Sequence, residues 1–94
     1  MSESSMYILL SLYDGEKHGY GVILKTREIT NGEVELVTAT VYSAIGRFII
    51  YGLVDYSREN DDKKYYKITE LGKRILIDEY TRVEKLKRNI ESIL

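Results

Sequence analysis

The hydrophobic pattern of the first third of the chain predicts two short helices. Apolar side chains crowd together from Met6 to Tyr13, and Asp14-Gly15 ends this run as a turn. A second helix opens at His18 and stops at Asn31-Gly32, with apolar positions at helical spacing. These apolar positions are Tyr20, Ile23 and Leu24. The region is therefore expected to form two helices that bury one side each.

A third helix is predicted from about Ala39 to Tyr51, with Thr38 as its N-cap and Gly52 as its C-terminal stop. Its apolar stripe consists of Val41, Ala44, Ile45 and Phe48. The opposite face carries Thr40, Ser43 and Arg47. This face is small and able to form hydrogen bonds.

Two segments rich in Val, Ile, Tyr and Thr follow, at Leu53 to Arg58 and Lys64 to Thr69. The polar stretch from Glu59 to Lys63 between them is typical of a hairpin tip. Tyr66 and Ile68 alternate with period two and are expected to point into the core. The pattern predicts a two-stranded hairpin, the wing.

The last helix is predicted to begin after Thr69 and to run to Leu94, a length of roughly 37 Å at about 1.5 Å per residue. Its apolar stripe consists of Leu76, Tyr80, Val83, Leu86, Ile90 and Ile93. The small body before it is too short to cover this stripe, so its second half needs a partner. The element order predicts a mainly α winged helix-turn-helix fold, with residues 1–69 as the DNA-binding part and residues 70–94 as a dimerisation helix of the same compact domain.

Composition narrows the range of functions. The 94 residues suffice for one domain, and a chain without Cys and with a single His has no thiolate metal site, disulfide or thiol nucleophile. No pair of titratable groups stands at a catalytic spacing, so we expect no enzyme and no cofactor. We also expect no membrane role and a cytoplasmic location. Net charge is −1, but residues 1–35 carry three basic and six acidic side chains against eleven and nine in residues 36–94.

Four local motifs, taken in order, resemble the PadR family of transcriptional regulators and its compact subgroup. They are His18-Gly19-Tyr20, Thr40-Val41-Tyr42, Arg47-Phe48 with Gly52-Leu53-Val54, and Tyr65-Tyr66-Lys67-Ile68-Thr69-Glu70-Leu71-Gly72. The resemblance implies a dimer built largely by the last helix, a third helix that enters the major groove, and a wing along the neighbouring DNA backbone. This sequence departs from the usual residues of the family at four positions: Val37, Ala39, Ser43 and Gly46. These departures bear on which DNA sequence is preferred, and they leave the apolar stripe of the third helix intact.

The candidate DNA-binding residues lie on the third helix and the wing. On the helix they are Thr38, Thr40, Tyr42, Ser43 and Arg47; on the wing they are Lys63 and Lys64. An ordinary solvated face is the alternative for the helix, and a solvated hairpin tip is the alternative for the wing, where Asp61 and Asp62 oppose the lysines. His18 is interpreted as a helix-start residue, and Gly19 and Gly21 as close-packing positions.

The leading hypothesis is a homodimeric repressor of transcription that binds double-stranded DNA at a pseudo-palindromic operator. Tyr80 lies on the predicted dimer stripe, where its ring either packs in the interface, the favoured reading, or borders a cleft for a small apolar effector. The alternative function is a winged-helix module that binds protein without binding DNA. Salt-dependent duplex binding distinguishes the two.

Overall fold

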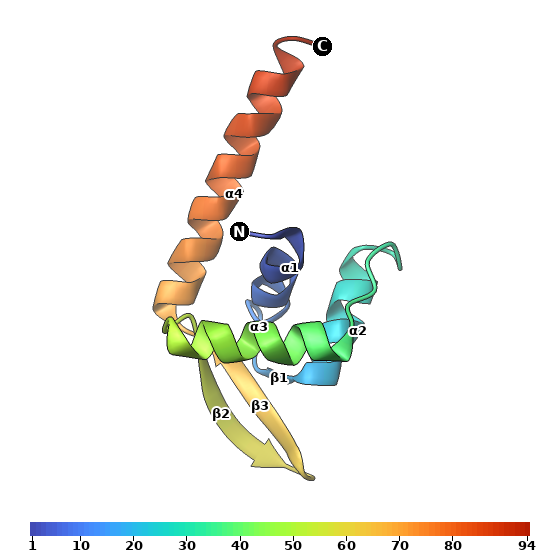
Figure 1. Cartoon of the computed structure of the whole chain (residues 1–94), viewed down its shortest axis with the longest axis vertical. Helices are drawn as coiled ribbons and strands as arrows, with labels where there is room; N and C mark the ends of the chain where they lie inside the picture. Colours follow the sequence, from blue (N-terminus) through green and yellow to red (C-terminus); the bar gives the residue numbers. More distant parts are fainter.

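A computed structural model describes residues 1–94 and contains four helices and a three-stranded antiparallel sheet. The order is α1 (Glu3–Ser11), β1 (Lys17–His18), α2 (Gly19–Ile29), α3 (Thr38–Ile50), β2 (Val54–Asn60), β3 (Lys63–Ile68) and α4 (Glu70–Glu91). Figure 1 shows α4 extending from one side of the helical body and the hairpin of β2 and β3 from the other. The predicted winged helix-turn-helix fold is confirmed, with one strand more than the sequence pattern indicated.

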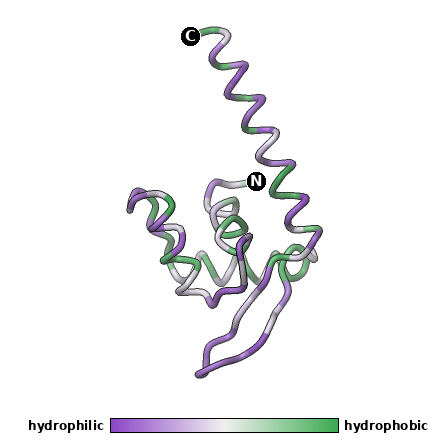
Figure 2. Tube along the Cα trace, turned by 180° about the vertical axis from the view of Figure 1, so that it is seen from behind, coloured by the Kyte–Doolittle hydropathy of each residue, from purple (hydrophilic) through white to green (hydrophobic).

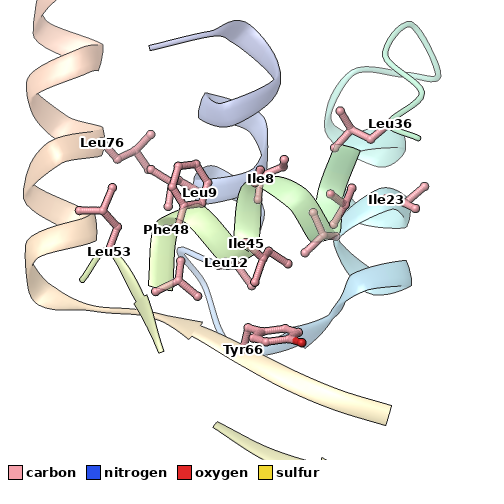
Figure 3. Packing of buried hydrophobic residues seen from close by; sticks show 14 residues of the cluster. Ile8, Leu9, Leu12, Ile23, Leu36, Ile45, Phe48, Leu53, Tyr66 and Leu76 are labelled. Atoms are coloured by element: carbon pink, nitrogen blue, oxygen red, sulfur yellow. The ribbon is translucent and has the colours of Figure 1, made fainter. Parts of the chain in front are cut away.

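The core lies where the first three helices meet the base of the sheet. Figure 3 shows side chains from α1, α2 and α3 converging on one another, with Tyr66 of β3 beneath them. The predicted apolar stripe of α3 is buried as expected: Val41, Ala44, Ile45 and Phe48. Burying a Val, Ile or Phe side chain contributes about 1.5–3 kcal/mol. This stripe therefore supplies much of the free energy that holds α3 against the body.

The helix starts differ from the sequence prediction at two places. Helix α1 begins at Glu3, because the Ser2 hydroxyl caps it by accepting from the Ser5 N–H at 3.1 Å. The predicted N-cap Thr38 is wrong: Val37 occupies that position, and its carbonyl accepts the first helical bond from the Val41 N–H at 3.0 Å. The Thr38 hydroxyl is therefore not used as a cap.

The predicted helix stops are confirmed, and both have Schellman-type geometry. After α3, Gly52 takes a φ of 77° and the Leu53 N–H donates to the Phe48 carbonyl at 2.8 Å. After α2, Asn31 takes a φ of 52° and the Gly32 N–H donates to the Arg27 carbonyl at 2.8 Å. Because these residues adopt the left-handed conformation, the chain turns away from each helix while N–H groups beyond its end donate hydrogen bonds to the last carbonyls.

The sheet has a short strand that the sequence pattern missed and a tighter tip than expected. Strand β1 pairs with β3 through Lys17 opposite Tyr66 and His18 opposite Tyr65, and two residues are too few to produce an alternating pattern. The wing turns at Asp61-Asp62, both with positive φ, as a two-residue hairpin turn requires. The rest of the predicted tip belongs to the strands, although Figure 2 shows that it is strongly hydrophilic.

The start of α4 is fixed to the end of α3. The Thr69 hydroxyl donates to the Gly52 carbonyl at 2.6 Å and accepts from the Gly72 N–H at 3.0 Å. A Cβ on Gly72 would lie 2.2 Å from the Leu53 carbonyl oxygen, so only glycine allows this approach. No helix of the chain, α4 included, combines the length and apolar character needed to cross a bilayer.

The stripe predicted for α4 divides into a buried and an exposed part. Leu76, assigned from sequence to the dimer interface, is 7% exposed and packs in the protomer's own core, because α1 lies against the first half of α4. The remaining stripe residues are exposed: Tyr80, Val83, Leu86, Ile90 and Ile93. Ile93 lies beyond the last helical residue, Glu91.

Candidate nucleic-acid interface

The exposed polar face of α3, here called the reading face, consists of Thr38, Thr40, Ser43 and Arg47. All four side chains are exposed. Thr40, Ser43 and Arg47 lie away from the buried stripe, whereas Thr38 is exposed as the first residue of the helix. Helix α3 contains no acidic residue, and none of the ion pairs in the structure includes Arg47. Arg47 Nη1 donates to Ser43 Oγ at 3.0 Å, which holds the guanidinium along the helix. Its positive charge is therefore available for an anionic partner.

Tyr42 packs against the first residue of α2. A Cβ placed on Gly19 would lie 2.5 Å from Cζ and 2.6 Å from the hydroxyl oxygen of Tyr42, so glycine is required for the ring to lie there. The prediction that Gly19 is a close-packing position is confirmed. At Gly21 the nearest atom to an added Cβ is 3.4 Å away, an ordinary contact, so close packing is not the reason for that glycine. Tyr42 remains 48% exposed, so its ring also contributes to the surface.

A hollow of about 280 Å³ lies where the wing meets the starts of α2 and α3, and we call it the tyrosine pocket. His18, Tyr20 and Tyr42 line it from the body, and Asp62, Lys63, Lys64 and Tyr66 line it from the wing. The structure thus brings together three of the predicted site residues, Tyr42, Lys63 and Lys64. The two lysines form no ion pair within the protein.

Sequence reasoning did not assign His18, Tyr20 or Tyr66 to any site. The predicted role of His18 at the helix start is confirmed, since its Nδ1 accepts from the Gly21 N–H at 3.1 Å. Burial and, after it, the charge of Lys63 lower the pKa of His18, which favours the neutral ring. In the sequence, the only signal for this pocket was the number of tyrosines together with the lysines of the wing. Only the fold shows that tyrosines from different segments surround one space.

Arg58 differs from the other wing cations. Its guanidinium pairs with the Glu16 carboxylate and lies 4.4 Å from the centre of the Tyr65 ring. Glu16 also accepts from the Ser57 hydroxyl, and these two bonds lower the pKa of the Glu16 carboxyl, the Ser57 bond first. Arg58 therefore braces the wing against the loop before β1, and it is not free in the way that Lys63 and Lys64 are.

A second surface, the apolar groove, lies between α1 and α4 and has a volume of about 600 Å³. Its apolar lining comes from Met6, Tyr7, Leu10 and Tyr13 of the α1 region and from Leu76, Ile77, Tyr80 and Val83 of α4. Further along α4, Leu86 and Ile90 border a shallower depression. The sequence predicted the α4 side of this surface, whereas the contribution of α1 follows only from its packing against α4.

The comparison with protein families identifies the chain. The model of the transcriptional regulator PadR-like family matches residues 8–78, from α1 through the wing and into α4. The chain belongs to the PadR-like family of transcriptional regulators. The resemblance noted in the sequence motifs is confirmed, and membership agrees with the prediction of a regulator. No curated protein matches this PadR-like chain.

Solved structures share the fold of this PadR-like regulator. A transcriptional regulator from Clostridium thermocellum matches with a TM-score of 0.85 at 23% identity, over 98% of this chain and 96% of that chain. A PadR family transcription regulator from hypervirulent Clostridium difficile gives 0.84 at 23% identity, over 98% of each chain. Bacillus subtilis PadR in complex with operator DNA gives 0.70 at 23% identity, over 79% of this chain and 44% of that one. These likenesses establish a common winged-helix architecture.

Proposed function

We propose that this PadR-like protein is a sequence-specific DNA-binding repressor that acts as a homodimer. The observation that carries the proposal is the reading face, a helical surface of small hydrogen-bonding side chains with one cation and no acid. A helix of this width fits the major groove, where hydroxyl and guanidinium groups reach base edges and phosphates. The Bacillus subtilis relative, solved with operator DNA, supports the same use of the fold here.

The wing supplies a second contact in this proposal. Lys63 and Lys64 are exposed, free of carboxylate partners and adjacent to the start of α3. Cations in this position neutralise backbone phosphates and release counterions, which adds affinity without adding sequence information. Thr38, Thr40, Tyr42, Ser43 and Arg47 would then carry the selectivity.

The apolar groove supports the proposal of a dimer. Tyr80 is 62% exposed, and together with Val83, Leu86 and Ile90 it continues the groove along the part of α4 that leaves the body. A second copy of α4 and α1 would remove these side chains from water. In this arrangement residues 1–69 bind DNA and residues 70–94 hold the two copies together, with half-sites about one helical turn of DNA apart in a pseudo-palindrome. A small, flat apolar effector that enters the groove beside Tyr80 is the second candidate occupant.

The decisive experiment is the Arg47→Ala variant in a duplex titration with operators selected from a random pool. We expect affinity to fall by about 10- to 100-fold, as removal of one charged base or phosphate contact costs about 1–3 kcal/mol. Arg88→Ala, which removes the same charge near the end of α4, serves as the matched control and should bind like the wild type. Unchanged affinity and unchanged salt dependence in Arg47→Ala would reject the reading face as the DNA contact.

The same titration separates the two candidate functions. A DNA-binding regulator shows duplex affinity that falls steeply with salt, because bound cations displace counterions from DNA. A winged-helix module that binds protein, which the near-neutral net charge favours, would show no salt-dependent duplex binding at all. That outcome would replace the repressor with the protein-binding alternative.

A further inference from the structure

Tyr66 is the only buried residue among those that line the tyrosine pocket, and the fold itself makes no use of its hydroxyl. Tyr66 is only 8% exposed, yet its hydroxyl takes part in no hydrogen bond within the protein. It is not sealed in the interior either, since no buried side-chain atom lacks a partner. The ring lies under α3 with its oxygen turned toward the start of α2, and Tyr66 lines the tyrosine pocket (Figure 3). The hydroxyl is therefore accessible from this pocket and can donate a hydrogen bond to an acceptor bound there.

Most of the other groups around the pocket are also hydrogen-bond donors, the exception being the Asp62 carboxylate. The Tyr42 hydroxyl lies directly over Gly19, at the start of α2, where the first-turn N–H groups have no acceptors within the helix. His18 Nδ1 accepts from Gly21, so the neutral ring carries its proton on Nε2. Burial, followed by the neighbouring Tyr42 and Tyr56, raises the pKa of Tyr66, which keeps its hydroxyl a donor at neutral pH.

Charge at the pocket favours an anion. Lys63 and Lys64 contribute two positive charges and Asp62 contributes one negative charge, which leaves a balance of +1 while His18 is neutral. The positive end of the α2 dipole adds to this balance. A ligand that satisfies several converging donors and one or two cations has several oxygen acceptors and a negative charge, and a phosphate group has both.

We infer that the tyrosine pocket binds one phosphate group of the DNA backbone, with the Tyr66 hydroxyl as a buried donor to it. This inference rests on the proposed function and adds a defined position for the duplex: one backbone phosphate is held at the junction of the wing, α2 and α3. It also explains why the wing lysines and Tyr42 surround the same space. The contact fixes the register of α3 in the groove and reads no base itself.

The test combines Tyr66→Phe with operators in which single phosphates are replaced by neutral methylphosphonates. In the wild type, one position in each half-site should lower affinity about tenfold, as expected for a hydrogen bond to a charged group. Tyr66→Phe should bind the unmodified operator about tenfold more weakly and lose most of the penalty at that position alone. Tyr65→Phe, the adjacent tyrosine whose side chain does not line the pocket, should keep the wild-type pattern.

Several outcomes would overturn the inference. A methylphosphonate scan that is identical in the wild type and in Tyr66→Phe would remove the buried donor from the DNA contact while leaving the proposed function intact. Absence of any duplex binding by the wild type would reject the proposed function and this inference with it. If Tyr66→Phe does not fold, Tyr42→Phe tests the opposite wall, and an unchanged scan there would count equally against the pocket.

A free anion is the other source of the same chemistry. Inorganic phosphate, titrated at constant ionic strength without DNA, should leave the amide resonances of Gly19 and Tyr20 unchanged up to millimolar concentration, because one isolated phosphate lacks the rest of the duplex contact. Displacement of the operator by millimolar phosphate but not by chloride, together with a flat methylphosphonate scan, would assign the pocket to a free phosphate and overturn the backbone contact.

Discussion

The two ends of the molecule differ in the chemistry of the side chains that they expose. The reading face and the tyrosine pocket present hydroxyls, two lysines and an arginine, although Val37 and Ile50 at the two ends of α3 are also exposed. The apolar groove at the other end presents Met, Leu, Ile, Val and Tyr side chains over a volume of about 600 Å³. Polar groups that gain from contact with an anion lie at one end, and apolar groups that gain from leaving water lie at the other.

This difference shows how a small domain separates two kinds of surface. Only 14 apolar residues form the buried core, and they lie between the two ends. Helices α1 and α3 each contribute their buried side to that core and their outer side to one of the two surfaces: α3 to the reading face, and α1 to the apolar groove. Substitutions confined to one surface should therefore leave the folding of the other surface intact.

The largest expected effect comes from a charge at the apolar end. Val83→Glu places a carboxylate in the apolar groove, where an unpaired charge that becomes buried on association costs several kcal/mol, on the order of 3–5 kcal/mol. We expect the proposed dimer to dissociate at micromolar concentration, as measured by sedimentation equilibrium, while the thermal midpoint of the single chain changes little. Arg88→Glu, on a different side of α4, should remain dimeric.

An effect of intermediate size is expected at the polar end from Gly19→Ala. The added methyl group would lie 2.5 Å from the Tyr42 ring, so the ring or the start of α2 must move. Because the clashing atoms are the outer end of a half-exposed ring, the cost lies at the low end for overpacking, about 1 kcal/mol, which urea unfolding measures directly. Duplex affinity should fall as well, because the displaced ring disturbs both the tyrosine pocket and α3, whereas the dimer should persist.

Gly46→Ala is the matched control for Gly19→Ala. Gly46 lies in the middle of α3 with no atom within 4 Å of an added Cβ. Replacing a helical glycine by alanine stabilises a protein by about 1 kcal/mol, so this variant should raise the urea midpoint. A loss of stability in Gly46→Ala, or none in Gly19→Ala, would contradict the packing described for this end.

The smallest effect is the pH dependence that His18 contributes. The folded protein favours the neutral ring and lowers its pKa, so the unfolded chain binds the proton more readily. This contribution to stability is complete above the unfolded value of about 6.5 and is lost as pH falls through the lower folded pKa. His18→Asn keeps a capping side chain without this titration and should show a flatter urea midpoint between pH 7.5 and 5.5.

The carboxylates with shifted pKa values do not interfere with this measurement between pH 7.5 and 5.5. Asp14, Glu16, Glu35 and Glu79 have pKa values lowered by their hydrogen bonds to cationic or hydroxyl partners, so their contributions are lost only at more acidic pH. They are the same in the wild type and in His18→Asn. Equal slopes for the two proteins between pH 7.5 and 5.5 would show that the cap does not depend on the neutral ring.

Regular elements were predictable from sequence because their signals are local. The stripe of α3, the stops at Asn31 and Gly52 and the presence of the wing all follow from spacing and from residues that adopt a left-handed conformation. Strand β1 was missed because two residues have no periodicity, and the burial of Leu76 within the chain was not expected because a stripe gives no indication of where α1 ends its cover of α4. These features depend on tertiary contacts.

The candidate site was predictable only in part for the same reason. Residues of one helix face, such as Ser43 and Arg47, share a surface whatever the rest of the fold does. The tyrosine pocket joins segments more than 40 positions apart, His18 and Tyr66 among them, and its buried hydroxyl looks like an ordinary core residue in the sequence. The ion pair between Arg58 and Glu16 spans a similar separation in the sequence. The sequence therefore did not show that Arg58, unlike Lys63 and Lys64, already has a carboxylate partner.

The junction of Thr69 and Gly72 with the end of α3 leaves no flexible joint between the two helices. In a paired molecule, α4 therefore acts as a stiff lever: a small rotation where two copies meet becomes a larger displacement of each α3 at the far end. Substitutions along the outer half of α4 would then change the spacing of the recognised half-sites without changing any residue that contacts DNA.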